Sequence, residues 1–160
     1  AQIANGGYKI YPKIVLNKYD ENRKEDKFQP LIKNFRNIKI VQEAMFSSTN
    51  EVRGTSYGSR IEDPKYQFAG KTGTAQVKRI TKQDRELDLK TLEIPYEERD
   101  HALYVAYGPY RNPRYAVSIL IEHGGSGSSV AAPIAKKLFK KIIDRHQIRK
   151  DFNSKKYLDI

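Results

Sequence analysis

A chain of 160 residues, of which 38% are apolar and 31% charged, has the size and composition of one globular domain with a modest core. Its apolar runs fall far below the roughly 20 residues of a membrane span, and the absence of cysteine excludes disulfides, thiolate zinc sites and cysteine nucleophiles. The formal net charge of +11 would attract nucleic acid, anionic lipid or acidic glycan without choosing among them.

The N-terminal third is expected to hold an extended segment, a loop and a helix. Residues 1–7 lack the features of a signal peptide and are typical of the end of a helix in a longer protein. Residues 8–16 favour an edge strand or two short strands, because Pro12 interrupts a β-rich run. The polar run 17–27 predicts a loop. Asn37 is a suitable N-cap for a helix that reaches about Ser47.

The middle of the chain predicts antiparallel strands. A strand is expected around Lys71, followed by a long charged connection or flap over residues 81–100. Two apolar runs, 103–107 and 115–121, are separated by a stretch rich in glycine and proline, which predicts a hairpin of central strands.

The C-terminal part predicts an amphipathic helix. Residues 124–129 form a glycine- and serine-rich loop, and Pro133 suits the first turn of a helix behind it. Ile134, Leu138 and Ile142 recur every four residues, flanked by Ala135, Phe139 and Ile143 and with lysines on the other side, so that the helix should lie on the sheet. The polar tail, residues 150–160, is expected to fray. The fold class is therefore α+β, an antiparallel sheet with a C-terminal amphipathic helix packed on it.

The strongest chemical signal is the sequence Lys71-Thr72-Gly73-Thr74. An ammonium, two hydroxyls and a glycine at a strand edge suit an anionic acyl substrate. Lys-Thr-Gly is one of three motifs found in penicillin-binding proteins and class A β-lactamases, beside Ser-x-x-Lys and Ser-Asp-Asn. No serine of the chain has a lysine three positions later, so that the acylating serine is missing.

Two other interpretations of short motifs are weaker. Gly70-Lys71-Thr72 could end a phosphate-binding loop, but the first glycine of that motif would stand at position 65, which is Lys65. Residues 48–50 match Ser-x-Asn by letters, but they lie too close to Lys71 for the expected order, and we interpret them as a helix-terminal turn.

The flanks of these motifs resemble the C-terminal part of the transpeptidase domain of class B penicillin-binding proteins. The similarity is to the elongation type, penicillin-binding protein 2, more than to the division-specific type. It is carried by residues 68–76, Asp100-His101-Ala102, Glu122-His123-Gly124-Gly125 and residues 129–135. The resemblance covers about residues 1–149 and implies a partial serine transpeptidase or β-lactamase-like domain.

The resemblance assigns roles to the matching positions. Lys71 and Thr74 are implied to be catalytic, the Thr74 N–H serving as one oxyanion donor. Thr72, Gly73 and Thr74 would bind the substrate, and His123, Gly124 and Gly125 would lie next to the site. The resemblance places no nucleophile in this chain and implies neither a metal nor a cofactor.

The three histidines do not have the spacing of a metal site. His101 should begin a strand, with its ring hydrogen-bonded to the backbone. For His123, a structural role in holding the glycine loop is favoured over substrate contact. His146 falls in the predicted helix.

By resemblance, the chain is a fragment of a peptidoglycan D,D-transpeptidase that cross-links stem peptides through an acyl-serine intermediate and binds penicillin. Alone it should be inactive. The parent would be anchored in the inner membrane, with its catalytic domain on the periplasmic face and membrane proteins of the elongation machinery as partners. Without the upstream part, apolar surface should be partly uncovered at four residues: Tyr104, Val105, Ile119 and Ile121.

Two alternatives from other classes remain open at this stage. One is a non-catalytic binding module derived from a transpeptidase half, which the missing Ser-x-x-Lys favours. The other is a nucleic-acid binder, supported only by the positive charge and the 11 tyrosines.

Overall fold

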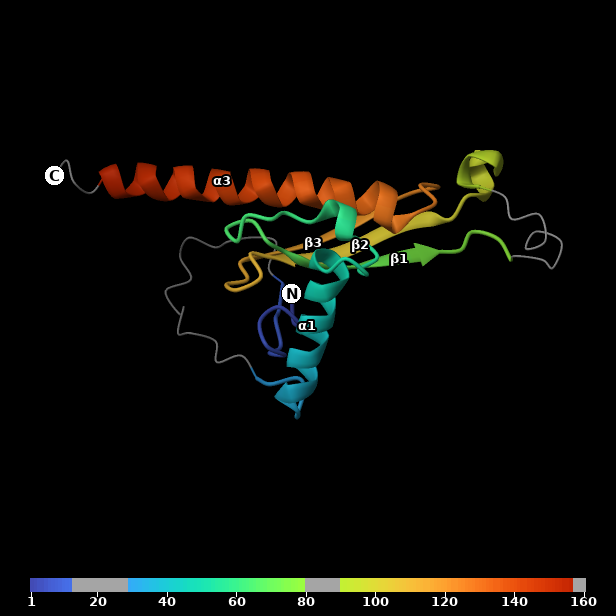
Figure 1. The fold of residues 1–160 in the computed structure, drawn as a ribbon. Helices are drawn as coiled ribbons and strands as arrows, with labels where there is room; N and C mark the ends of the chain where they lie inside the picture. Colours follow the sequence, from blue (N-terminus) through green and yellow to red (C-terminus); the bar gives the residue numbers. More distant parts are fainter. Residues whose placement is uncertain (13–28, 80–89, 157–160) are drawn as a thin grey trace.

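The computed structural model of the protein describes residues 1–12, 29–79 and 90–156, the part after residue 146 as backbone only. A three-stranded sheet lies beneath a long C-terminal helix, and a second helix projects from the sheet on the other side (Figure 1). The main elements are α1 (Phe35–Asn50), β1 (Ala69–Ala75), β2 (His101–Gly108), β3 (Tyr115–Ile121) and α3 (Ala132–Lys156). Short helical turns cover Tyr57–Ser59, Thr91–Glu93, Tyr96–Glu98 and Gly127–Ala131.

The sheet is antiparallel in the order β1-β2-β3, which confirms the predicted hairpin of central strands. Thr72 of β1 and Ile119 of β3 both lie opposite Tyr104 of β2, so that these three residues share one face. Val105 follows Tyr104 and points to the opposite face. The register thus decides which apolar side chains meet α3.

The core lies between the sheet and α3. Phe68, Tyr104 and Phe139 are its largest fully buried hydrophobic side chains. The ring of Phe68 stacks on Phe139 at a centroid distance of 4.9 Å and meets Tyr104 edge-on at 6.4 Å. Ala132 and Ala135 are also buried, and their small side chains let α3 approach the strands closely.

The buried stripe of α3 lies within the predicted apolar face, on the row that flanks Leu138. The stripe runs through Ala135, Phe139 and Ile143, whereas Leu138 is 37% exposed at the margin. The two rows of the predicted face repeat every four residues and lie one position apart, so that spacing alone cannot tell which is buried more deeply. The stacking of Phe139 on Phe68 decides in favour of the observed one. Pro133 lies in the first turn of α3, as expected.

The ends of both helices differ from the prediction. Helix α1 begins three positions earlier, because the side chain of Asn34 rather than Asn37 accepts the hydrogen bond of an N-cap, from the Arg36 N–H. Helix α3 continues to Lys156, through much of the tail that was expected to fray. Lysine, arginine and glutamine are good helix formers, and no proline or glycine interrupts this stretch.

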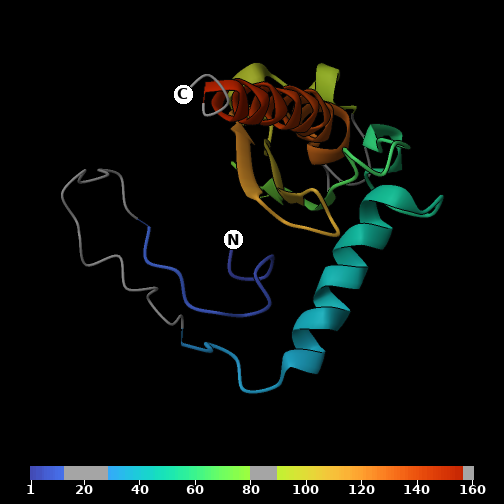
Figure 2. The ribbon, with the colours of Figure 1, turned by 90° about the vertical axis from the view of Figure 1, so that its left-hand side faces the viewer.

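The N-terminal segment lies beside α1 (Figure 2), and Gln42 of the helix donates to the Ile3 carbonyl oxygen at 2.6 Å. Of the predicted strand at residues 8–16, the described part shows an isolated antiparallel bridge between Tyr8 and Pro30. The predicted loop at 17–27 and residues 81–89 of the predicted connection lie outside the described residues, and the rest of that connection contains the turns Thr91–Glu93 and Tyr96–Glu98.

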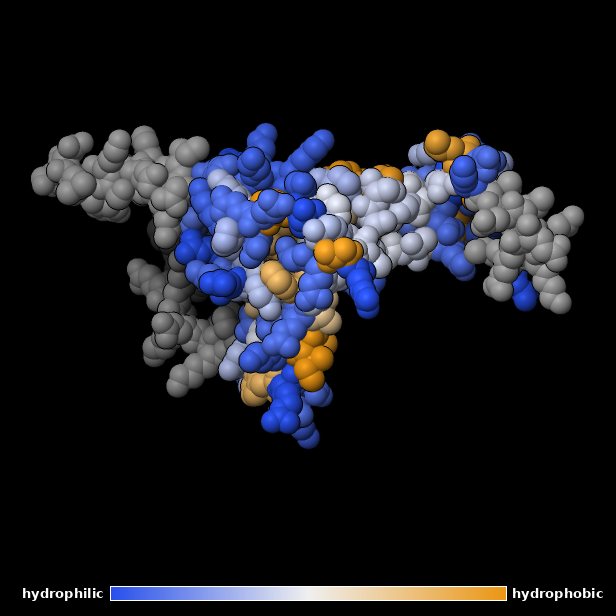
Figure 3. All heavy atoms as spheres, viewed as in Figure 1, coloured by the Kyte–Doolittle hydropathy of each residue, from blue (hydrophilic) through white to orange (hydrophobic). Residues whose placement is uncertain are grey.

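The prediction of partly uncovered apolar surface is confirmed for Val105 and Ile121 and is wrong for Tyr104 and Ile119. Tyr104 and Ile119 are buried under α3, because they alternate with the residues of the other face. Val105 is 46% exposed on that other face, and Ile121 is partly buried at the margin of the core. The surface of α1 also carries apolar side chains (Figure 3).

Within the described residues, no helix combines the length and the apolar character that a membrane span needs. The same part of the chain contains no cluster of histidine and acidic side chains suited to hold a metal ion.

Candidate active site

The predicted motif lies on the edge strand of the sheet. β1 carries Lys71, Thr72, Gly73 and Thr74, and β2 is its only strand partner among the described residues. Lys71 and Thr74 are exposed, and the two residues between them are partly exposed. An edge strand presents unpaired N–H and C=O groups, to which an extended peptide can add as another strand.

The ammonium of Lys71 turns back along its own strand. Its Nζ donates to the Thr72 carbonyl oxygen at 2.9 Å and to Thr72 Oγ1 at 3.3 Å. Thr72 Oγ1 is in turn 3.4 Å from Thr55 Oγ1, which lies 3.2 Å from Ser48 Oγ. The motif therefore stands in a row of hydroxyl groups that joins β1 to the end of α1. Thr55 and Ser48 were not predicted as members of this row, because their segments have the sequence pattern of turns.

A buried tyrosine crosses β1 and reaches the end of α1. The hydroxyl of Tyr104 lies 2.9 Å from Thr49 Oγ1 and 3.1 Å from Ser56 Oγ. To reach them it passes over Gly70, where a Cβ atom would stand 2.2 Å from the tyrosine oxygen. The glycine before Lys71 is thus required by packing. Burial raises the pKa of Tyr104, and the hydrogen bonds to Ser56 and Thr49 oppose that rise.

The last turn of α1 fixes the start of β1. Asn50 Nδ2 donates to the Phe68 carbonyl oxygen at 3.0 Å, and Thr49 Oγ1 lies 3.5 Å from the Gly70 carbonyl oxygen. Residues 48–50 end helix α1, which confirms their interpretation as a helix-terminal segment. Their hydrogen bonds nevertheless give them a part in positioning the strand.

The glycine loop after β3 reaches β1 through a residue that was not predicted. A Cβ atom on Gly127 would lie 2.8 Å from the Gly73 carbonyl oxygen and 2.5 Å from that of Leu103. Gly127 therefore packs directly on the backbone of the motif. His123, Gly124 and Gly125, the predicted neighbours of the site, lead into this contact, and the Gly125 N–H donates to the Asp100 carbonyl oxygen at 2.7 Å.

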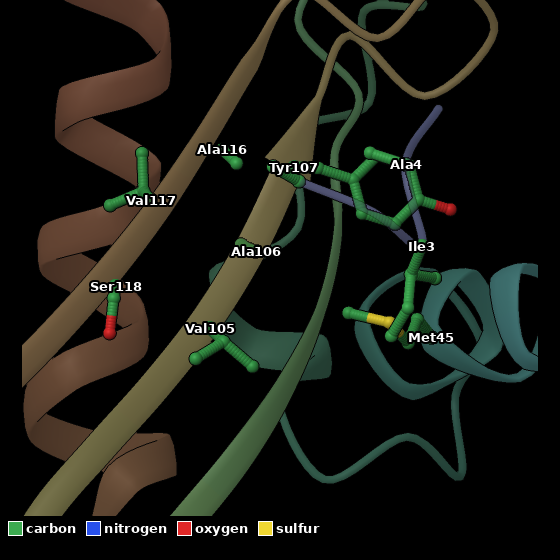
Figure 4. A pocket seen from close by; sticks show the side chains of 10 residues that line it. Ile3, Ala4, Met45, Val105, Ala106, Tyr107, Ala116, Val117 and Ser118 are labelled. Atoms are coloured by element: carbon green, nitrogen blue, oxygen red, sulfur yellow. The ribbon is translucent and has the colours of Figure 1, made fainter. Parts of the chain in front are cut away.

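Lys71 also borders an apolar groove. The groove has a volume of about 690 Å³ and runs between α1 and the open face of the sheet, lined by Ile40, Val41, Met45 and Val105 among others. A second cavity of about 330 Å³ lies nearby, between the first residues of the chain and the same sheet face (Figure 4). Figure 4 shows Ile3 and Met45 facing Val105 across this space. An acyl-transfer site would use the polar rim at Lys71 rather than these apolar walls.

Comparison with known proteins then decides the family. The family model described as penicillin binding protein transpeptidase domain matches residues 1–140. The chain belongs to this family. The peptidoglycan D,D-transpeptidase MrdA of Salmonella typhimurium is 37% identical over 105 residues, which are 66% of this chain and 16% of that protein. The chain thus spans about one sixth of the length of the curated relative.

Solved structures of transpeptidases share the fold. Pseudomonas aeruginosa PBP2, solved in complex with WCK 5153, matches 88% of this chain and 28% of its own, with 30% identity and a TM-score of 0.64. Helicobacter pylori PBP2, solved in complex with MreC, matches 77% of this chain and 20% of its own, with 27% identity and a TM-score of 0.60. The resemblance to penicillin-binding protein 2 and the α+β transpeptidase fold class are confirmed. The roles of the individual site residues stay predictions.

Proposed function

We propose that this chain is the Lys-Thr-Gly portion of a peptidoglycan D,D-transpeptidase that cross-links stem peptides through an acyl-serine intermediate. One observation carries the proposal: Lys71 and Thr74 are exposed on the free edge of β1, in a chain whose family match extends over residues 1–140. A stem peptide or a β-lactam would lie along this edge as an added strand.

Each residue of the motif has a task in this proposal. The Lys71 ammonium attracts the substrate carboxylate and favours proton transfer among the neighbouring hydroxyls. The hydroxyls of Thr72 and Thr74 donate to that carboxylate. The Thr74 N–H supplies one oxyanion donor, and the loss of one such donor costs about a hundredfold or more in rate. Gly73 leaves room for the substrate backbone.

The nucleophile would come from another part of the polypeptide. The 160 residues contain no Ser-x-x-Lys, and a serine acyltransferase cannot form its intermediate without an activated serine. The isolated chain should therefore gain no covalent label from a fluorescent penicillin. A polypeptide that joins it to a transpeptidase segment with Ser-x-x-Lys should be labelled. A denaturation-resistant label on the isolated chain would contradict the proposal.

The role of the strand edge is tested by two substitutions in that longer polypeptide. Lys71→Ala or Thr74→Val should slow penicillin acylation at least about tenfold, which is about 1.4 kcal/mol of transition-state stabilisation. Lys137→Ala on the exposed side of α3 is the matched control and should leave the rate unchanged. All three proteins should melt at nearly the same temperature. Acylation at the normal rate in both site variants would assign the motif to structure alone.

The labelling experiment also separates this proposal from a non-catalytic binding module. A module that lost its chemistry would stay unlabelled even beside an intact Ser-x-x-Lys segment. The continuous family match supports the enzyme instead.

We place the parent on the periplasmic face of the inner membrane, held there by an anchor outside this chain. The relatives are bacterial cell-wall enzymes, and a PBP2 neighbour was solved in complex with MreC. We infer membrane proteins of the elongation machinery as partners. Fractionation of cells that express the tagged parent, with crosslinking to copurified proteins, tests both points.

A further inference from the structure

Two histidines meet at the end of the sheet next to the motif. His101 is the first residue of β2 and pairs with Ala75, which directly follows Thr74 in β1. His123 stands two residues after the end of β3 and directly precedes the glycine loop, residues 124–127. Their rings lie edge to face, with centroids 4.8 Å apart.

The hydrogen bonds of the pair determine which nitrogens carry protons. The backbone N–H of His123 donates to Nδ1 of His101 at 2.9 Å, so that this nitrogen must hold a free lone pair. His101 is therefore neutral, with its hydrogen on Nε2. Nδ1 of His123 lies 3.1 Å from the Arg99 carbonyl oxygen, which can only accept, so that His123 carries its hydrogen on Nδ1.

The hydrogen bond to His101 stabilises an unfavourable backbone conformation of His123. His123 has φ +54°, in the left-handed region that residues with a Cβ atom rarely adopt. Gly125 follows with φ +75°, and its N–H is held by the Asp100 carbonyl oxygen. Residues 100 and 101 thus hold the loop through two hydrogen bonds, to the N–H groups of Gly125 and His123.

The loop held in this way is in direct contact with the Lys-Thr-Gly strand. The loop ends at Gly127, which packs on the Gly73 backbone without space for even a methyl group. The Asp100 carboxylate also accepts a hydrogen bond from the Val77 N–H, just beyond β1, at 3.3 Å. A loosened loop would therefore release the strand on which the substrate is expected to lie.

We propose that neutral His101 is a positioning residue for the Lys-Thr-Gly strand, and that protonation of its Nδ1 releases the glycine loop and slows acylation at acidic pH. The inference rests on the proposed function for its effect on acylation, but its structural part does not. Protonated Nδ1 becomes a donor and faces the donor N–H of His123, so that the bond cannot survive.

The charged and titratable groups around the pair come from each element that meets there. They are Arg99, Asp100 and Tyr96 before β2, Glu122 after β3, and the pair of Lys78 with Glu98 between β1 and the turn at Tyr96–Glu98. Tyr96 lies against the His123 ring at 4.9 Å.

The structural part is tested on this chain by nuclear magnetic resonance of the histidine side chains. At pH 8, nitrogen shifts and couplings should show the Nε2–H form of His101 and the Nδ1–H form of His123. On acidification, the His123 backbone N–H signal should move in step with the protonation of His101. A His101 ring that carries its hydrogen on Nδ1 at pH 8, or a His123 amide unaffected by its protonation, would overturn the inference.

The functional part is tested on the longer polypeptide with two substitutions. His101→Asn keeps an acceptor near the position of Nδ1 but cannot be protonated, whereas His101→Leu removes the acceptor. The wild-type rate of penicillin acylation should fall about tenfold from pH 8 to pH 5, because a small misplacement of reacting groups slows a reaction strongly. The asparagine variant should keep its rate across this range, and the leucine variant should be slow throughout. His146→Gln, on α3, is the control and should follow the wild type.

The outcomes separate this inference from the proposed function. A wild-type polypeptide that is not labelled at any pH would contradict the proposed function, and the resonance experiment would still decide the role of His101. Labelling with the same pH profile in the wild type and the asparagine variant would overturn the inference alone.

Discussion

The two faces of the sheet both carry apolar residues but differ in how they are covered. On one face, Tyr104 and Ile119 are buried under α3 and pack with its aromatic and alanine side chains. On the other, Val105 and Leu120 are 46% and 53% exposed. The difference shows that the described part contains one complete core layer and one open apolar face. The motif residues stand at the edge where the two faces meet.

The largest effect should come from the packed face. Phe139→Ala would remove a fully buried ring stacked on Phe68 and should lower the free energy of unfolding by about 3 to 5 kcal/mol. The adjacent Leu138→Ala should cost less than about 1 kcal/mol, because Leu138 lies at the exposed margin. Urea denaturation of the two variants measures both values. Equal losses would mean that α3 is rotated relative to the structure.

A smaller loss is expected where the strand and its buried tyrosine cross. Gly70→Ala would place a methyl group against the Tyr104 hydroxyl and should cost about 2 to 3 kcal/mol through displacement of the tyrosine from its partners. Gly58→Ala is the matched control, because nothing lies within 4 Å of its added methyl group. Thermal melting of the pair tests the prediction. If both variants melt together, Tyr104 does not occupy the space over Gly70.

The smallest effect on stability belongs to the open face. The double substitution of Val105 and Leu120 by serine should change the free energy of unfolding by less than about 1 kcal/mol, since both residues are already about half exposed. It should nevertheless reduce the binding of a hydrophobic dye and the self-association of the chain. Val52→Ser, at an isolated position that is 78% exposed, is the control. Unchanged dye binding in the double variant would show that this face is not the exposed apolar surface.

The sequence predicted the parts of the fold that depend on local pattern. Alternating β-branched and aromatic residues predicted the hairpin, and Pro133 predicted the start of α3. The apolar face of α3 was predicted, but which of its rows is buried most deeply depends on Phe68, which is far away in sequence. The helix start was misplaced because Asn34 and Asn37 are both good caps, and only the backbone geometry distinguishes them.

The motif of the candidate site was predicted from the sequence, but the residues that hold the motif in place were not. Lys71 and its neighbours carry a recognisable pattern, which the family match supports. Thr49, Ser56 and Tyr104 carry none, since a buried network of hydroxyl groups is formed by segments about 50 residues apart. Gly127 looked like one more residue of a flexible loop. Its importance comes from what lies beneath it, which no local pattern reveals.

The contact between Gly127 and Gly73 couples two positions that are 54 residues apart in their tolerance to mutation. A single methyl group at position 127 would press on the backbone of the motif without touching a ligand. Under the proposed function, the affinity for a β-lactam would then change through a residue outside the Lys-Thr-Gly motif. A survey of drug-tolerant variants confined to the motif residues would overlook this position.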